Sequence, residues 1–195
     1  MLIKRKQEFR YHVWNCLQKL LGATSLDDRL DGTAIISQIE ASRIDFLIAV
    51  PDIVTSDGLL WPLSKLKSPR LLRVCREDEG FGIAAGLSFC DRRALILIQH
   101  TGLLDSINAL RAIGVEYALP ICLMVGLLGK EPGKPLHESS RYGLRMIEPI
   151  LAAFNVSYHL IEANADVPKI RPAIDQAYAS SWPAVLLIGR RPAAQ

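Results

Sequence analysis

The stretch RLLRVCREDEGFGIAAGLSF, residues 70–89, joins a short apolar run to a segment rich in glycine and alanine, with acids at the junction. The run is typical of a buried strand and the segment of a helix, so the stretch predicts one strand–turn–helix unit. Acids favour the first turn of any helix because they complement its dipole. A carboxylate placed there among apolar side chains also has a proton affinity that its surroundings can tune for chemistry. Both interpretations apply to Glu77, Asp78 and Glu79.

The same alternation of strand and helix continues along the chain. Six apolar runs lack polar alternation, as strands covered on both faces do: 45–50, 70–75, 94–99, 120–126, 157–162 and 184–189. Segments of helical period separate them: 33–41, 77–89, 102–114, 138–154 and 167–179. Thr33 is the expected cap of the first helix, and Pro149 predicts a kink or an early break in the fourth. The fold class predicted is α/β, a single-domain parallel sheet of about six strands with helices on both faces.

The composition sets the domain organisation. The 195 residues are 50% hydrophobic and 22% charged, which suits one folded domain. Residues 1–25 predict an N-terminal helical extension, and residues 26–195 form the α/β domain. The basic segment at 4–6 is short and is not interleaved with aromatic residues, so we expect no nucleic-acid partner.

The chain shows no targeting or metal-binding pattern. Its N-terminus is polar, and no apolar stretch approaches the ~18 residues of a membrane span, so we expect no membrane association and a cytoplasmic location. The four cysteines contain no CxxC pair, which argues against a zinc site or a disulfide framework. We therefore predict no metal ligands in this chain.

Polar residues follow four of the predicted strands. In open parallel sheets, ligands bind beyond the carboxyl ends of the strands, so these residues are expected to converge on one mouth. The candidates are Asp52; Glu77, Asp78 and Glu79; Gln99, His100, Thr101 and Gly102; and residues 126–137.

A dinucleotide-binding site is one alternative. Gly80, Gly82 and Ala85 match the GxGxxA spacing, but acids separate them from the strand and would repel a phosphate. The next strand ends in Gln99 and His100 instead of an acid able to hold a ribose. A P-loop and a GxSxG elbow are both absent from the sequence.

Three motifs, taken in order, resemble one family. REDEGFGIAAG, ALILIQHTGLLDSINAL and PICLMVGLLGKEPGKPLHES are similar to the pyrimidine-binding (PYR) domain of thiamine-diphosphate enzymes. The likeness covers residues 45–156 and points to the α chains of two-subunit sulfopyruvate decarboxylases and to phosphonopyruvate decarboxylases. It implies non-oxidative decarboxylation of a small 2-oxoacid to an aldehyde.

The resemblance also implies roles for particular residues. The family's glutamate lies nine residues before a helix glycine, which here places it at Glu77. By resemblance, Glu77 hydrogen-bonds the aminopyrimidine of thiamine diphosphate and so activates the cofactor. Gln99, Thr101 and Gly102 belong to the loop that contacts the cofactor. His100 is the candidate for moving a proton, with a capping or supporting role as the alternative. The substrate-side candidates are Asp52 and His137, and each also fits an ordinary loop residue.

Two departures from the family concern the substrate. Leu104–Asp105 stands where a Gly-Asn pair is usual, and Leu128 stands where an arginine is common. An arginine would suit a sulfonate or phosphonate. Arg141, Lys130 or a partner chain are the other sources of that charge.

The chain has no GDG…N signature for a diphosphate-binding domain. The resemblance therefore implies a β subunit that carries this domain and its Mg²⁺, in a homo- or hetero-oligomer without which this chain is inactive. Another thiamine-diphosphate decarboxylase or carboligase, or a non-catalytic PYR-like assembly module, remains an alternative.

Overall fold

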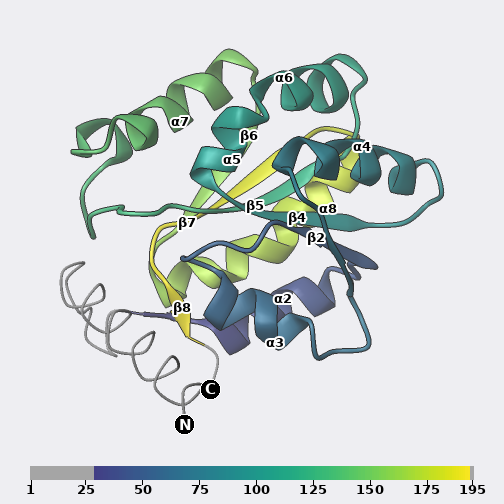
Figure 1. Cartoon of the computed structure of the whole chain (residues 1–195), viewed down its shortest axis with the longest axis horizontal. Helices are drawn as coiled ribbons and strands as arrows, with labels where there is room; N and C mark the ends of the chain where they lie inside the picture. Colours follow the sequence, from purple (N-terminus) through teal and green to yellow (C-terminus); the bar gives the residue numbers. More distant parts are fainter. Residues whose placement is uncertain (1–28, 194–195) are drawn as a thin grey trace, which may run out of the picture.

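A computed structural model of the chain describes residues 29–193. The predicted extension at 1–25 and its basic segment lie outside these residues. Six parallel strands form one sheet in the order β3-β2-β4-β5-β7-β6 (Figure 1). They are β2 (Phe46–Ala49), β3 (Arg70–Arg73), β4 (Ala94–Gln99), β5 (Cys122–Gly126), β6 (Ser157–Ile161) and β7 (Ala184–Ile188). All six predicted strands and the α/β class are confirmed.

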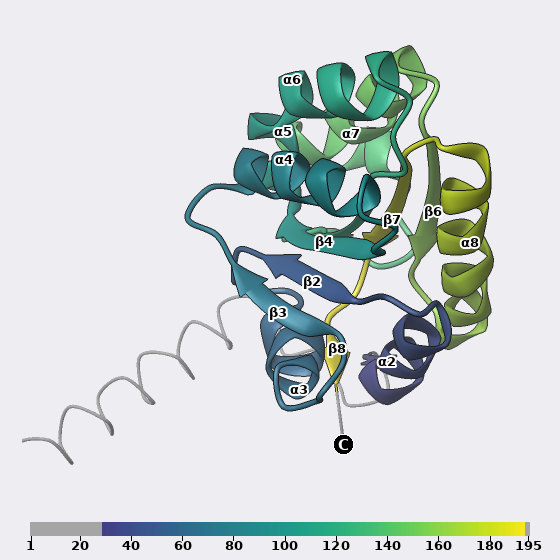
Figure 2. The same ribbon diagram turned by 90° about the vertical axis from the view of Figure 1, so that its right-hand side faces the viewer.

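Helices cover both faces of the sheet, as Figures 1 and 2 show. One face carries α2 (Gly32–Ala41), α3 (Trp61–Leu63) and α8 (Ile170–Ser180). The other carries α4 (Glu77–Ser88), α5 (His100–Asp105), α6 (Ile107–Ala109) and α7 (Tyr142–Ala153). Within β4, Leu95 and Leu97 pack on the first side and Ile96 and Ile98 on the second. Every side chain of such a strand is buried, which explains its continuous apolar sequence.

Several boundaries differ from the prediction. Asp31, not Thr33, caps α2, since its carboxylate accepts the Ala34 N–H at 3.0 Å. Helix α7 runs through Pro149 to Ala153, so the expected early break is wrong; the exposed Pro149 ring faces away from the core. The helix predicted over 102–114 begins at His100 and is divided into α5, α6 and η3 (Leu110–Glu116).

Some short elements have no counterpart in the prediction. They are η2 (Ser56–Leu60) with α3, η4 (Leu136–Glu138), η5 (Asn164–Lys169), and a two-residue parallel pairing of β1 (Leu30–Asp31) with β8 (Pro192–Ala193). Across residues 29–193, no helix has the length and apolar character needed to cross a bilayer.

The strand order defines where a ligand fits. From β2 the chain crosses to β3 on one side, and from β3 it returns to β4 on the other side of β2. The connections after β2 and β4 therefore diverge, and ligands of open α/β sheets bind at the carboxyl ends of strands that diverge in this way.

Candidate functional site

Three helices of the same face begin at this carboxyl edge. Helix α4 begins at Glu77, α5 at His100 and α7 at Tyr142. Helix α5 packs between α4 and α7, so the three N-termini are neighbours (Figure 1). The positive ends of three helix dipoles thus point toward one region of the surface.

The three acids of α4 have different surroundings. The Glu79 carboxylate accepts the backbone N–H groups of Cys75 and Arg76 at 3.0 and 3.2 Å, so it caps the helix. Asp78 forms a two-pronged ion pair with the Arg76 guanidinium. Glu77 forms no hydrogen bond or ion pair with any other residue in 29–193. Two of the three acids therefore serve the helix, and Glu77 is the one whose carboxylate is available to a ligand.

Glu77 lies against the backbone of Gly102 in the first turn of α5. A Cβ on Gly102 would overlap the Glu77 side chain and stand 2.5 Å from its Oε1. Gly102 is buried and Glu77 is half-buried. The absence of a side chain at position 102 therefore allows the Glu77 carboxylate to sit at the mouth without full exposure to water.

Gln99 and Thr101 frame the same turn. The Thr101 hydroxyl donates to Gln99 Oε1 at 2.9 Å, Gln99 is half-buried, and Thr101 is exposed. The structure thus brings three of the predicted cofactor residues, Gln99, Thr101 and Gly102, next to Glu77.

His100 is buried, with only 5% of its surface exposed. Its Nδ1 lies 3.3 Å from the Leu128 N–H, so the backbone after β5 holds the ring in place. Burial lowers the pKa of His100 below its ordinary 6.5; a backbone hydrogen bond at Gly126 opposes the shift, Arg141 adds to it, and Asp52 opposes it. The ring is therefore neutral near pH 7.

Asp52 is at the mouth but already has partners. Its Oδ1 accepts the N–H groups of Val54 and Thr55 at 2.6 and 3.0 Å, and its Oδ2 accepts the Thr55 hydroxyl. The loop it holds passes over the end of β5, where a Cβ on Gly126 would lie 3.0 Å from Oδ1. In this structure Asp52 acts as the anchor of a turn.

His137 stands apart from the other candidates. It is exposed on η4, and its Nε2 lies 3.6 Å from the neighbouring Glu138 carboxylate. The described contacts do not join it to Glu77 or His100.

The loop from β5 to α7 is held by internal pairs. The Lys130 ammonium is buried against the Glu162 carboxylate at 2.8 Å, so it is not a free cation for a substrate. Hydrogen bonds from Ser140 and Ser139 lower the pKa of Glu131 to about 2. These contacts fix the loop that leads to Arg141, whose side chain lies over the backbone of Gly129.

Two features of the site were not predicted. The capping role of Glu79 has a sequence signal, since a glutamate three residues after the N-cap is the capping-box position. Gly143, which packs beside the His100 ring, has no such signal. Across 29–193 there is no group of three or more His, Cys, Asp or Glu side chains able to hold a metal ion.

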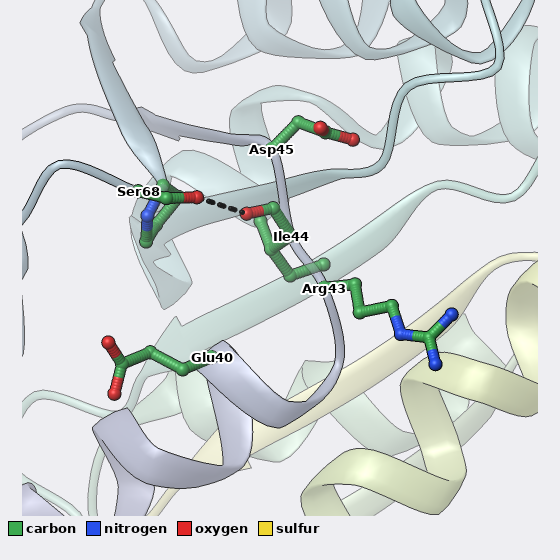
Figure 3. Close-up of a pocket in the computed structure, with 6 residues that line it drawn as sticks. Glu40, Arg43, Ile44, Asp45 and Ser68 are labelled. Atoms are coloured by element: carbon green, nitrogen blue, oxygen red, sulfur yellow. Dashed lines mark hydrogen bonds between the residues drawn. The ribbon is translucent and has the colours of Figure 1, made fainter.

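A separate pocket lies at the amino edge of the sheet, opposite the mouth (Figure 3). The charged ends of Glu40 and Arg43 extend away from each other in this view. The Asp45 carboxylate accepts hydrogen bonds from the Arg92 guanidinium and from the Arg93 backbone N–H. Charged groups do not converge on this pocket, so it is not the candidate site. Its lining residues are Glu40, Arg43, Ile44, Asp45, Ser68 and Pro69.

Comparison with curated proteins shows that the chain is similar to sulfopyruvate decarboxylase α subunits. The chain is 28% identical over 155 residues, which is 79% of this chain and 90% of the relative, to sulfopyruvate decarboxylase subunit alpha of Methanocaldococcus jannaschii. It is 33% identical over 98 residues to the subunit alpha of Methanothermobacter thermautotrophicus. This chain is a distant relative of sulfopyruvate decarboxylase α subunits.

The relationship has limits in coverage. The matched segment spans 59% of the Methanothermobacter subunit, and a match at 31% identity spans 57% of the Methanococcus maripaludis subunit alpha. No family model matches the chain. The predicted resemblance to sulfopyruvate decarboxylase α subunits is confirmed at this distance.

Proposed function

We propose that this chain is the pyrimidine-binding subunit of a two-chain thiamine-diphosphate-dependent decarboxylase that acts on a sulfopyruvate-like 2-oxoacid. The observation that carries the proposal is Glu77, a half-buried carboxylate without a partner in 29–193, held against Gly102 where three helices begin. The reaction converts the 2-oxoacid and one proton to an aldehyde and carbon dioxide.

The residues at the mouth fit the pyrimidine half of thiamine diphosphate. The glutamate of the resemblance corresponds to the acid whose oxygens are unused, and the neighbouring turn of Gln99, Thr101 and Gly102 would contact the ring. When bound, thiamine diphosphate supplies a thiazolium ring that accepts the electron pair released as carbon dioxide leaves. We propose that Mg²⁺ and the diphosphate are held by the partner.

Glu77 would hold and exchange a proton at a pyrimidine nitrogen. Its half-buried position excludes part of the water that would otherwise compete for the carboxylate. Since burial keeps His100 neutral near pH 7, its ring would not start the reaction as an imidazolium acid.

One face of α4 supports a second chain at the mouth. Gly82, Gly86 and Phe89 recur at helical spacing, and no atom of residues 29–193 lies within 4 Å of a Cβ built on either glycine. Phe89 is 78% exposed. A glycine inside a helix costs about 0.5–1 kcal/mol relative to alanine, and nothing described in this chain requires one at these positions. A close-packed partner helix would explain both glycines, which lie about one and a half and two and a half turns after Glu77.

The partner face can be tested with one pair of substitutions. Gly86→Ala should raise the unfolding free energy of the isolated chain by about 0.5–1 kcal/mol, because alanine favours the helix. Gly86→Leu should leave the chain folded but prevent co-purification of the partner. Ala152→Leu, at an exposed position of α7, is the matched control and should leave co-purification unchanged. If the Gly86→Leu chain still co-purified with the partner, the proposal that the partner packs on this face of α4 would be contradicted.

The function itself is tested on the two-chain complex. The chain is co-purified with a second chain that carries a GDG…N motif, and carbon dioxide release is measured with and without thiamine diphosphate. We expect cofactor-dependent release from sulfopyruvate. Release from phosphonopyruvate or pyruvate instead would identify another decarboxylase of the same scaffold. Cofactor binding without release from any 2-oxoacid would identify a non-catalytic module, and tight nicotinamide binding by the chain would support a dinucleotide site.

A further inference from the structure

The first turn of α7 has unused hydrogen-bond donors. Arg141 is the N-cap of this 12-residue helix, and no side chain caps it. Within 29–193, the N–H groups of Tyr142 and Gly143 form no hydrogen bond. Such amides, together with the positive end of the helix dipole, favour an anion.

A buried side chain points into this turn. The Nε2 edge of the His100 ring faces Gly143, where a Cβ would stand 3.6 Å from Nε2. The Nδ1 atom is used by Leu128, whereas Nε2 forms no standard hydrogen bond with the described residues. A histidine that is 95% buried therefore directs its Nε2 edge at the start of α7.

Arg141 adds a positive charge to the same place. Its side chain lies across Gly129, whose φ of +79° and missing Cβ leave room for the guanidinium. The charge is close enough to His100 to contribute to lowering its pKa.

The other cations of this loop have partners. Lys130 pairs with Glu162, and Lys134 lies 3.8 Å from the Glu131 carboxylate. The Arg145 guanidinium donates to backbone carbonyls of Ser139 and Ser140. In residues 128–145, Arg141 is the lysine or arginine whose side chain forms neither an ion pair nor a hydrogen bond with a described residue.

We propose that Arg141, the free amides of the α7 first turn and His100 Nε2 form a subsite for the second acidic group of a 2-oxoacid substrate. This inference rests on the proposed function and narrows it to substrates with an anionic tail, such as a sulfonate. The guanidinium fork matches a group with several equivalent oxygens. The Arg141 guanidinium supplies the positive charge that is missing at position 128, where this chain has a leucine.

The reacting carboxylate is the other anion of such a substrate, and it fits this subsite less well. That carboxylate loses its negative charge as carbon dioxide leaves. A cation bound to it stabilises the ground state more than the transition state and slows the step. A cation on the far acidic group keeps its full interaction throughout the reaction, so it contributes binding without this penalty.

The kinetic test compares two substrates on the two-chain complex. Arg141→Gln should raise the KM for sulfopyruvate about 10- to 100-fold with little change in kcat, and it should leave the KM for pyruvate unchanged. Lys134→Gln removes the same charge from the same loop and should change neither KM. Equal effects of Arg141→Gln on both substrates, or no effect on either, would overturn the subsite.

A binding test separates the subsite from the proposed function. NMR signals of the His100 ring are followed in the full chain alone as 3-sulfopropanoate is added, with propanoate as the control ligand. We expect saturable shifts with 3-sulfopropanoate only, and their loss in Arg141→Gln. If these shifts occurred and the two-chain complex decarboxylated no 2-oxoacid, the subsite would be supported and the proposed function refuted. Absence of shifts, or shifts that persist in Arg141→Gln, would refute the subsite.

Discussion

The two edges of the sheet use polar side chains in opposite ways. At the amino edge, the Arg93 guanidinium donates to the Ser42 carbonyl at 2.6 Å and to Asp175 at 2.7 Å. It also stacks on the Tyr178 ring at 4.6 Å, and the Arg93 N–H donates to Asp45 at 2.8 Å. These polar groups have partners within the chain, and their pairing joins α2 and α8 to the sheet.

The carboxyl edge contains both kinds of group side by side. Asp52 accepts three hydrogen bonds from its own loop, whereas Glu77 accepts none from any residue in 29–193. Arg141 and His100 Nε2 are likewise without partners in those residues. A polar group whose hydrogen bonds are satisfied stabilises the fold, and one held in place without them is available to a ligand. The comparison therefore assigns stability to the amino edge and chemistry to part of the carboxyl edge.

A single methyl group at the carboxyl edge should have a large effect on the rate of decarboxylation. Gly102→Ala places a Cβ where the Glu77 side chain lies and so displaces the carboxylate. A misplacement of about 1 Å can reduce a rate about 10²-fold, and we expect a loss of this size in kcat for decarboxylation. The flexible Glu77 side chain can move, so urea unfolding should show little loss of stability. Asp105→Ala, at the exposed end of α5, is the control and should retain activity.

A change at the amino edge should have the reverse character. Arg93→Met removes two charge-assisted hydrogen bonds and should lower the unfolding free energy by about 2 kcal/mol, with kcat unchanged in the folded fraction. Arg171→Met, which removes a more exposed partner of the same Asp175, should cost less than about 0.5 kcal/mol. A lower kcat in fully folded Arg93→Met would contradict the assignment of stability to the amino edge and of catalysis to the carboxyl edge.

The parts of the fold that follow from local pattern were predictable. Buried parallel strands are continuous apolar runs, and their carboxyl ends must share one edge, so both the sheet and the position of the mouth could be inferred. The local pattern could not show which of the three acids is free. That depends on the folded contacts of the other two, because Glu79 accepts backbone N–H groups and Asp78 pairs with the Arg76 guanidinium. The turn role of Asp52 likewise depends on a loop whose η2 segment has no sequence period. Arg141 reaches Gly129 only through the folded loop.

The smallest effect concerns the pH dependence of stability. Because burial lowers the pKa of His100 in the folded state below 6.5, the unfolded chain binds more protons once the pH falls below that value. The contribution of His100 to stability is therefore complete above pH 6.5 and is lost progressively as the pH falls below it. His100→Gln should flatten this part of the curve in urea unfolding, whereas His137→Gln, at an exposed position, should not. An unchanged slope in His100→Gln would contradict a neutral buried ring.

The role proposed for the unpartnered carboxylate of Glu77 is to activate thiamine diphosphate. Hydrogen–deuterium exchange at the thiazolium carbon of the cofactor, measured by quenched-flow NMR in the two-chain complex, tests it directly. Glu77→Gln should slow the exchange about 10²- to 10⁴-fold while the chain remains folded and bound to its partner, and Asp78→Asn should not. Exchange in Glu77→Gln as fast as in the unaltered complex would contradict the account.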